Sequence, residues 1–444
     1  MSKYIPIIGL EVHVELKTKS KMFCGCSADY FGKEPNTHTC PVCLGLPGAL
    51  PIPNKQAIEW CIKIALALGC EINLFSKFDR KNYFYHDLPK GYQISQYDLP
   101  FGTKGSIVLS NGKTIGITRV HMEEDTGKLS HHETNGVKTS LVDFNRSGVP
   151  LVEIVTEPDF HDAKDVVEYL QMLRSIVRYL DVSNADMEKG DMRLEPNISL
   201  STDPTKLPNY KVEVKNINSF RFVDKAIAYE IKRHEEILER GETPIQETRG
   251  WNENKNATFS QRVKEEANDY RYFPEPDIPP IRHTQEAIDE LKKTLPELQT
   301  EKIARFTKEY SLPAIKAEIL TREKSRADEF ENAVKLGQEK GISPEQIANM
   351  IINRPDDLEI HVNNTIHVEA LLQRVELENK REEISEEELK LVIQKVIADN
   401  PKAVEDYKSG KESVIMFLVG QCMRAIGRKV DANIVKQSLI KALT

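Results

Sequence analysis

The 444-residue sequence has no apolar run of about 18 residues, the length that a membrane-spanning helix requires. It also lacks the features of a secretory signal, because Glu11 and His13 interrupt the hydrophobic residues near its start. Cysteine is scarce: seven residues are an odd number and too few to crosslink so long a chain. We therefore expect a soluble cytoplasmic protein without disulfides and without a membrane anchor.

Excess positive charge is also absent. The chain has 61 Lys and Arg against 69 Asp and Glu, a formal charge of -8, which excludes binding of nucleic acid by bulk positive charge. The distribution is uneven, since residues 401–444 hold eight basic and four acidic residues. Any contact with nucleic acid is therefore expected near the C-terminus.

Several common motifs are missing. The sequence has no G-x-x-x-x-G-K-[ST] loop, no G-x-G-x-x-G after a strand, no H-E-x-x-H and no G-x-S-x-G. These absences exclude the usual nucleotide-binding and hydrolase scaffolds. If the protein uses ATP, a metal ion and scattered basic residues must hold the phosphates on a less usual fold.

The order of strand-like, helical and turn segments along the chain predicts an α+β protein. We expect several domains, because 444 residues exceed the length that one hydrophobic core usually serves. Residues 1–290 mix short strand-like runs with a few helices, which we expect Asn54, Asp162 and Asp224 to cap. Residues 291–380 read as a helical domain. A charged stretch at 376–388 then precedes a small helical tail domain, 381–444.

Four cysteines lie in two close pairs. Cys24 and Cys26 are followed, after thirteen residues, by Cys40 and Cys43. This spacing in a loop-rich segment is typical of a structural zinc site, in which four thiolates leave no position open for a reactive water. The alternative is four unrelated buried thiols. The other cysteines, Cys61, Cys70 and Cys422, fall in apolar helical patterns and are expected in cores.

The run from Ile8 to Leu16 alternates strictly between apolar and other residues. Glu11, His13 and Glu15 share one face of the predicted strand. Because residues two apart on a strand stand about 6.6 to 6.8 Å from each other, Glu11 and His13 are able to reach one cation. A solvated strand face is the alternative explanation.

Glu153 lies in the apolar run 149–155 and is therefore expected in a fully buried strand. A carboxylate there must be protonated, paired or bound to a metal. Alternation along 118–124 points Glu124 to the apolar side, beside Glu123 and Asp125. These three acids form either a solvated turn or a site for a hard cation such as Mg²⁺.

Long stretches of the chain resemble the B subunits of aspartyl/glutamyl-tRNA amidotransferases, the GatB family. The stretches include IGLEVHVELKTKSKMF (8–23), FDRKNYFYHDLPKGYQISQYDLP (78–100), GITRVHMEEDTGKL (116–129), LVDFNRSGVPLVEIVTEPD (141–159), KVEVKNINSFRFV (211–223), QETRGW (246–251), KEEANDYRYFPEPDIPP (264–280) and ADNPKAVEDYKSGKESVIMFLVGQCM (398–423). The resemblance runs nearly end to end and is far more specific than a short motif.

The resemblance implies the kinase part of a heterotrimer with an amidase A subunit and a small C subunit. ATP would phosphorylate the side-chain carboxylate of Glu on tRNA(Gln) or Asp on tRNA(Asn), with Mg²⁺ offsetting charge on the phosphoryl group. Ammonia released by the A subunit would then displace the phosphate. The sequence does not distinguish which mischarged tRNA is used, and a non-catalytic tRNA-binding scaffold is the main alternative. A zinc hydrolase is disfavoured by the all-thiolate site.

Residue by residue, the resemblance assigns the Mg²⁺ site to His13, Glu124 and Glu153, with Glu11 adjacent. It assigns zinc to the four cysteines. It assigns substrate, ATP or ammonia contacts to six further residues, for each of which a structural role is the alternative: Lys81, Tyr83, Lys90, Arg119, Lys215 and Asn216. Two positions depart from the family pattern: His86 stands where proline is usual, and Glu195-Pro196-Asn197 replaces an Asp-Ala-Asn type sequence. Both departures keep a usable polar group.

The tail is expected to contact the tRNA backbone through basic side chains. The candidates are Lys402, Lys408, Lys411, Arg424, Arg428 and Lys429. The alternative is a solubilising surface that touches nothing, since Lys-rich helix faces are ordinary.

Overall fold

The computed structural model describes residues 3–134, 136–203, 205–263, 270–353, 361–362, 365–379, 384–427 and 430–443. The chain forms two compact units. The first contains residues 1–303 and 322–324, and the second contains 304–321 and 325–444. Within the described residues, no helix is long and apolar enough to span a membrane.

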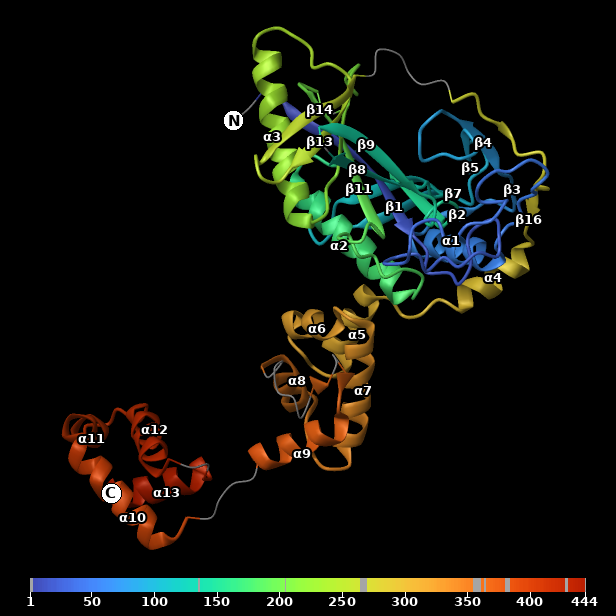
Figure 1. Ribbon diagram of the computed structural model, residues 1–444. Coiled ribbons are helices and arrows are strands. Elements are labelled where there is room, and N and C mark those ends of the chain that lie inside the picture. The colour runs from blue at the N-terminus through green and yellow to red at the C-terminus, as the bar shows by residue number, and fades with distance from the viewer. Residues whose placement is uncertain are drawn as a thin grey trace. The chain divides into compact units, whose positions relative to one another are not determined.

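A mixed sheet organises the first unit (Figure 1). Among the described residues it has nine strands, in the order β14, β13, β12, β11, β1, β10, β7, β6, β2. Neighbours are antiparallel except for the parallel pair β12 and β13. The strands are β1 (Ile5–Glu15), β2 (Glu71–Ile72), β6 (Gly102–Val108), β7 (Thr114–Glu124), β10 (Pro150–Thr156), β11 (Met192–Ser201), β12 (Val212–Lys215), β13 (Glu247–Asn252) and β14 (Ala257–Val263).

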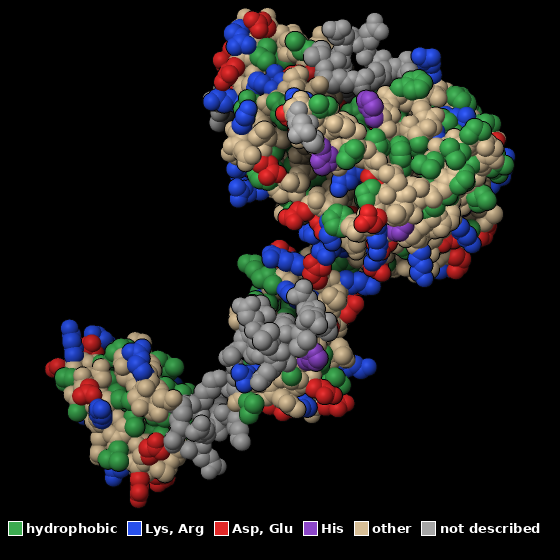
Figure 2. All heavy atoms as spheres, in the orientation of Figure 1, with side chains coloured by type: hydrophobic (Ala, Val, Ile, Leu, Met, Phe, Trp, Pro, Cys, Tyr) green, Lys and Arg blue, Asp and Glu red, His purple; other side chains and the backbone are tan. Residues whose placement is uncertain are grey.

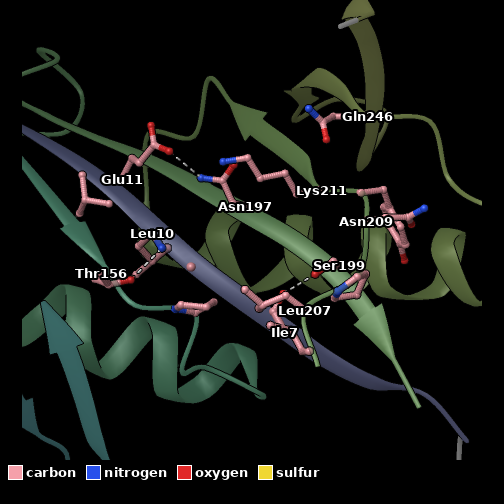
Figure 3. A pocket seen from close by; sticks show the side chains of 15 residues that line it. Ile7, Leu10, Glu11, Thr156, Asn197, Ser199, Leu207, Asn209, Lys211 and Gln246 are labelled. Atoms are coloured by element: carbon pink, nitrogen blue, oxygen red, sulfur yellow. Dashed lines mark hydrogen bonds between the residues drawn. The ribbon is translucent and has the colours of Figure 1, made fainter. Parts of the chain in front are cut away.

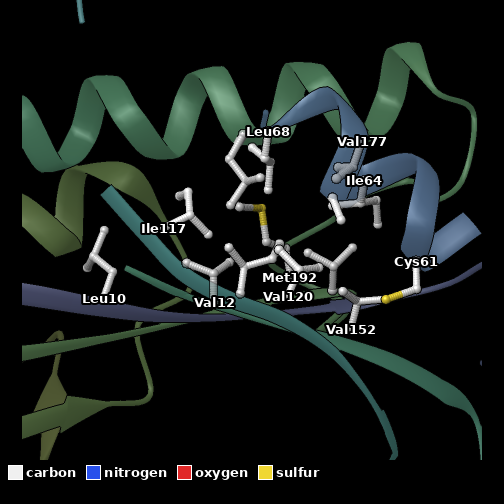
Figure 4. Close-up of a cluster of buried hydrophobic side chains, with 14 of the residues drawn as sticks. Leu10, Val12, Cys61, Ile64, Leu68, Ile117, Val120, Val152, Val177 and Met192 are labelled. Carbon is white, nitrogen blue, oxygen red and sulfur yellow. The ribbon is translucent and has the colours of Figure 1, made fainter. Parts of the chain in front are cut away.

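Three helices, α1 (Lys55–Ala67), α2 (Ala163–Tyr179) and α3 (Phe220–Glu239), pack on one face of this sheet. The alternation predicted for residues 8–16 is confirmed, since Leu10, Val12 and the other apolar members of the run are buried in the core. In Figure 4 these side chains meet Ile64 of α1 and Val177 of α2. The polar side chains of the same strands therefore lie on the opposite face.

The predicted helix caps are correct in two cases of three. Asn54 accepts a hydrogen bond from the Ala57 amide, and Asp162 caps α2 in the same way. Asp224 is not a cap, because α3 begins one turn earlier, where the Ser219 side chain accepts from the Phe222 amide. The earlier start adds the first turn of α3 to its packing surface, where Phe222 and the buried Val223 join the core.

Short strands edge the sheet and position the loops around it. The strands β4 (Asp79–Asn82), β5 (Tyr92–Ser95) and β15 (Phe273–Pro274) form one small sheet. The strands β3 (Phe75–Ser76) and β16 (Ile281–Arg282) form another, and β8 (Lys128–Thr134) pairs with β9 (Val137–Asp143). Helix α4 (Gln285–Lys293) packs on α1, so the first unit continues past the predicted boundary at residue 290.

The second unit is mainly helical, which together with the mixed sheet confirms the α+β class. Its helices are α5 (Gln299–Glu309, begun in the first unit), α6 (Ala314–Thr321), α7 (Lys324–Gln338), α8 (Pro344–Asn353), α9 (Val368–Asn379), α10 (Glu386–Asp399), α11 (Pro401–Lys408), α12 (Val414–Ile426) and α13 (Ala432–Leu443). A short ladder, β17 (His361–Val362) with β18 (Thr365–Ile366), interrupts a region predicted to be all helical. Helices α10 to α13 share a hydrophobic core of their own, and the predicted boundary at 380 lies outside the described residues.

Candidate metal centre and substrate cavity

The polar face of the sheet gathers ionisable side chains from three neighbouring strands. Glu153 of β10 pairs directly with His13 of β1 on one side and with His121 of β7 on the other. Directly opposed residues in an antiparallel ladder point to the same face of the sheet. The register therefore brings three segments that are far apart in the sequence to one place.

His13, Glu123 and Glu153 form the candidate metal cluster. Each offers one ligand atom, and these three atoms lie within 4.8 Å of one another. The Glu153 carboxylate lies 3.6 Å from His13 Nε2 and 3.3 Å from His121 Nε2, and Glu123 lies 3.7 Å from His121. The two carboxylates are only 2% and 5% exposed. Two buried acids this close are stable only when cations or donors surround them.

Glu124 does not join this cluster, although the sequence assigned it there. The two-residue period of β7 turns it to the opposite face, where Lys90 Nζ and the Ile94 amide hydrogen-bond to its carboxylate. Glu123 takes its place. That carboxylate accepts hydrogen bonds from Ser95 (2.8 Å) and Gln93 (2.9 Å), and Lys81 lies 3.4 Å away.

The charges of the cluster favour ionised carboxylates. Burial opposes the charge on Glu153, but His121 and His13 outweigh it and hold the pKa of Glu153 well below its usual range. In the same way burial lowers the pKa of His13, while the hydrogen bond with Glu153 and the negative charges of Glu153, Glu195 and Glu123 together raise it more, to about 9. Ionised carboxylate oxygens are the ligands that Mg²⁺ prefers.

The donor set fits a divalent cation. Two carboxylates and one imidazole face each other from different strands, and His121 contacts both carboxylates as an orienting neighbour. The Nδ1 atoms of His13 and His121 are buried and have no hydrogen-bond partner among the described residues. Buried polar atoms of this kind are uncommon in folded proteins and cluster where a ligand or ordered water completes the site.

Glu11 belongs to a neighbouring acidic group, not to the His13 cluster. Its carboxylate lies with those of Glu195 and Glu213 within 4.8 Å, and Asn197 donates to it at 3.0 Å. Lys215 lies 2.9 Å from Glu195 and 3.5 Å from Glu213. Burial and the charge of Glu153 raise the pKa of Glu11.

A cavity of about 500 Å³ opens over the cluster. Of the predicted substrate residues, Lys81, Tyr83 and Lys215 line it, together with His13, Glu123, Arg193, Glu195 and Tyr270. Arg119 lies beside the cluster, with Nη2 4.0 Å from Glu153.

Two predicted substrate residues lie away from this cavity. Lys90 lines a different cavity, next to Glu124 and Cys43. Asn216 adopts a left-handed backbone conformation (φ 63°) after β12, a structural role that asparagine tolerates well.

A second cavity, of about 380 Å³, lies along β1 and β11. Figure 3 shows Ile7 and Leu207 at one part of it and Leu10 and Glu11, with Asn197, at another. Because Glu11 belongs to the acidic group beside the cluster, this cavity borders the charged face of the sheet.

The four predicted zinc ligands meet in the loop between β1 and α1. The Sγ atoms of Cys24, Cys26, Cys40 and Cys43 lie within 4.8 Å of one another, and those of Cys40 and Cys43 are 3.8 Å apart. Zn–S bonds of about 2.3 Å put the corners of a tetrahedral site about 3.8 Å apart, so the thiols fit zinc.

Lys21 supplies a buried positive charge beside these thiols. Its side chain has no exposed surface, and Nζ lies 3.7 Å from Cys43 Sγ and donates to the His38 carbonyl at 2.8 Å. The Cys24 thiol, the Cys40 backbone and this ammonium lower the pKa of Cys43 to about 4. Cys61, Cys70 and Cys422 are buried in apolar cores, as predicted.

Four of the predicted tRNA contacts belong to the described residues of the tail, on or between its helices. Lys402 and Lys408 are on α11, Lys411 pairs with Asp406 at 2.8 Å, and Arg424 is near the end of α12. Arg428 and Lys429 lie outside the described residues. On the face visible in Figure 2, basic side chains are interspersed with acidic and hydrophobic ones.

Sequence reasoning missed His121, Arg193 and the grouping of Glu195 with Glu213, and it chose Glu124 over Glu123 for the cluster. A signal for two of them was present. His121 and Glu123 have the same parity on β7 and alternate with the apolar Val120 and Met122, so they share the polar face. The Glu153 to His121 register was not readable from one sequence, because it depends on the pairing of strands that are far apart along the chain.

Two family models cover almost the whole chain. The GatB/GatE catalytic domain matches residues 6–289, and the GatB domain matches residues 288–443. Relatives named as the B subunit of aspartyl/glutamyl-tRNA(Asn/Gln) amidotransferase include proteins of Thermoanaerobacter pseudethanolicus (45% identical, 100% of both chains), Carboxydothermus hydrogenoformans (45%, 99% of this chain and 98% of the relative) and Thermotoga petrophila (44%, 99% of both). The chain therefore belongs to the GatB family of amidotransferase B subunits.

Proposed function

We propose that this chain activates the side-chain carboxylate of Glu-tRNA(Gln), Asp-tRNA(Asn) or both, so that ammonia can convert it to an amide. The observation that carries the proposal is the buried cluster of His13, Glu123 and Glu153 at the floor of a polar cavity. A scaffold that only binds tRNA has no use for two ionised carboxylates buried side by side, because such burial is costly. The cluster therefore favours catalysis over the scaffold alternative.

His13, Glu123 and Glu153 would hold Mg²⁺. The bound ion would supply positive charge that offsets the charge of the phosphoryl group in transfer. His121 keeps the Glu153 carboxylate oriented, and Lys81 adds an ammonium group at the cavity wall. The positive charges of Lys81 and of the bound ion would attract an anionic substrate to the cavity wall that carries Glu123 and Glu153.

The proposed reaction has two steps. A carboxylate oxygen of the esterified amino acid attacks the γ-phosphorus of ATP, and the bond from that phosphorus to the bridging oxygen breaks, which gives an acyl phosphate and ADP. Ammonia then attacks the acyl carbon, inorganic phosphate leaves and the nitrogen loses a proton. The activation is needed because a free carboxylate is a poor electrophile.

The second cavity suits the nucleoside of ATP. Its lining includes the apolar residues Ile7 and Leu207 at one part, and another part holds Glu11 and Asn197 beside the acidic group. Apolar walls with a few convergent polar groups are typical of sites for small ligands. A nucleotide seated there would direct its phosphates toward the charged face of the sheet.

The other expected components follow the same proposal. The four cysteines would hold a structural zinc, and basic residues of the tail would contact the tRNA backbone. An amidase A subunit would supply ammonia and a small C subunit would complete a heterotrimer in the cytoplasm.

The test uses Glu153→Gln in the complete complex. We expect the variant to lose ATP-dependent phosphorylation of the mischarged tRNA while its affinity for tRNA stays within twofold of the wild type. Undiminished phosphorylation would remove the catalytic assignment. Loss of both properties with an unchanged melting temperature would favour the scaffold alternative.

A further inference from the structure

An aromatic segment forms part of the wall of the cavity above the metal cluster. Tyr83, Phe84 and Tyr85 follow β4 and line the cavity together with His13 and Glu123. Phe84 is 95% exposed and Tyr85 is 59% exposed. Among the described residues no other large hydrophobic side chain is as exposed as Phe84, so burial in the folded chain does not account for this ring.

The loop that carries these rings is fixed at both ends. Tyr83 Oη donates to Gln93 at 3.1 Å, and Gln93 donates to Glu123 at 2.9 Å. Farther along the loop, the Asp87 carbonyl accepts from the Gly127 amide at 2.9 Å, and its carboxylate accepts from Thr126 at 3.0 Å. The exposed ring of Phe84 is therefore presented from an anchored loop, and one anchor, Gln93, donates to the Glu123 carboxylate of the metal cluster.

The substrate of the proposed function carries an unpaired base close to the reacting group. The amino acid to be phosphorylated is an ester of the terminal nucleoside of tRNA, which belongs to a single-stranded end. Proteins bind unpaired bases chiefly by stacking them on aromatic side chains. A ring that lines the cavity of the acid cluster thus lies where that terminal base must arrive.

We propose that Phe84, supported by Tyr85, is the stacking platform for the 3′-terminal adenine of the mischarged tRNA. The inference rests on the proposed function and adds a binding residue for its macromolecular substrate. Adenine has a second source in ATP, but the cavity along β1 and β11 offers that nucleoside a separate place. The platform holds the ester so that the amino-acid carboxylate faces His13, Glu123 and Glu153.

Phe84→Ala in the complete complex tests the proposal by steady-state kinetics. We expect the KM for mischarged tRNA to rise about 5- to 150-fold, the range that base stacking on an aromatic ring contributes. The KM for ATP stays unchanged, and Phe84→Trp keeps the KM for tRNA within a few-fold of the wild type. The matched control is Phe259→Ala on β14, an aromatic that is 45% exposed and does not line the cavity.

A spectroscopic probe separates the two sources of adenine. Uncharged tRNA with 2-aminopurine at its 3′ end is expected to lose fluorescence on binding to the wild-type complex and to Glu153→Gln, but not to Phe84→Ala. A rise in the KM for ATP alone, or normal quenching with Phe84→Ala, overturns the proposal. Quenching by a wild-type complex that forms no acyl phosphate would contradict the proposed function and leave the platform intact.

Discussion

Replacing Glu123 and Glu124 one at a time distinguishes the role of the metal cluster from that of the ion pair between Glu124 and Lys90. Glu123→Gln keeps the size of the side chain and an acceptor for Ser95, but removes the charge that faces His13 and Glu153. Loss of one preorganised charged group in an active site costs about 100- to 1,000-fold in rate. We therefore expect kcat for tRNA-dependent phosphorylation to fall at least about 100-fold.

Glu124→Gln should act on stability instead. The Glu124 carboxylate is the partner of Lys90, whose side chain is 10% exposed, and the replacement leaves that ammonium buried without its counter-charge. Breaking a buried ion pair costs about 3 to 5 kcal/mol. The amide oxygen of glutamine still accepts from the Ile94 amide. We therefore expect the free energy of unfolding to fall by about 3 kcal/mol, at the lower end of that range.

Both quantities are measurable on the same two variants. Phosphorylation is followed with γ-labelled ATP and mischarged tRNA in the complete complex. Stability of the first unit is followed by urea unfolding and tryptophan fluorescence, because the two tryptophans of the chain, Trp60 and Trp251, both lie in that unit. If Glu124→Gln is inactive but fully stable while Glu123→Gln remains active, Glu123 is not the metal ligand. The ligand set expected from the sequence, with Glu124 in its place, would then be correct.

Three further predictions concern other parts of the chain. Elemental analysis should find one zinc per chain, and Cys40→Ser should lower both this stoichiometry and the melting temperature; a stable, zinc-free protein would contradict the site. Burial opposes the charge of Glu230, but His234 and Arg233 outweigh it and lower the pKa of Glu230 to about 2. In urea unfolding, the wild type should exceed Glu230→Gln in free energy of unfolding by about 3 to 5 kcal/mol. This difference should be complete above the ordinary pKa of 4.5 and disappear as the pH falls to about 2. A pH-independent difference would argue against this ion pair. Lys408→Ala should weaken binding of every tRNA alike and reduce the slope of log affinity against log salt by about 1, whereas an unchanged slope would mean that α11 does not contact the backbone.

The polar and apolar faces of β1 were predictable because strand geometry has a fixed period. The alternation of residues 8–16 placed His13 opposite the core, and the apolar neighbours of Glu153 indicated its burial. The zinc spacing was predictable for a similar reason, since the ligands are close in the sequence. Local rules therefore accounted for each strand and loop taken by itself.

The choice between Glu123 and Glu124 required the relation between strands. Alternation already turned Glu124 to the apolar side of β7, but only the pairing of β10 with β7 shows that the cluster forms on the other side. Likewise Ser219 and Asp224 are both suitable caps, and packing of the first turn of α3 against the core decides between them. Non-local packing is the information that a single sequence does not carry.

The position of the metal ion decides between Glu123 and Glu124 as its ligand. Crystals of the complex soaked with Mn²⁺, which replaces Mg²⁺ at oxygen-rich sites, allow the ion to be located by its anomalous scattering. We predict a peak within coordination distance of His13, Glu123 and Glu153. A peak bound by Glu124, or no peak at the cluster when Mn²⁺ supports phosphorylation in solution, would contradict this prediction.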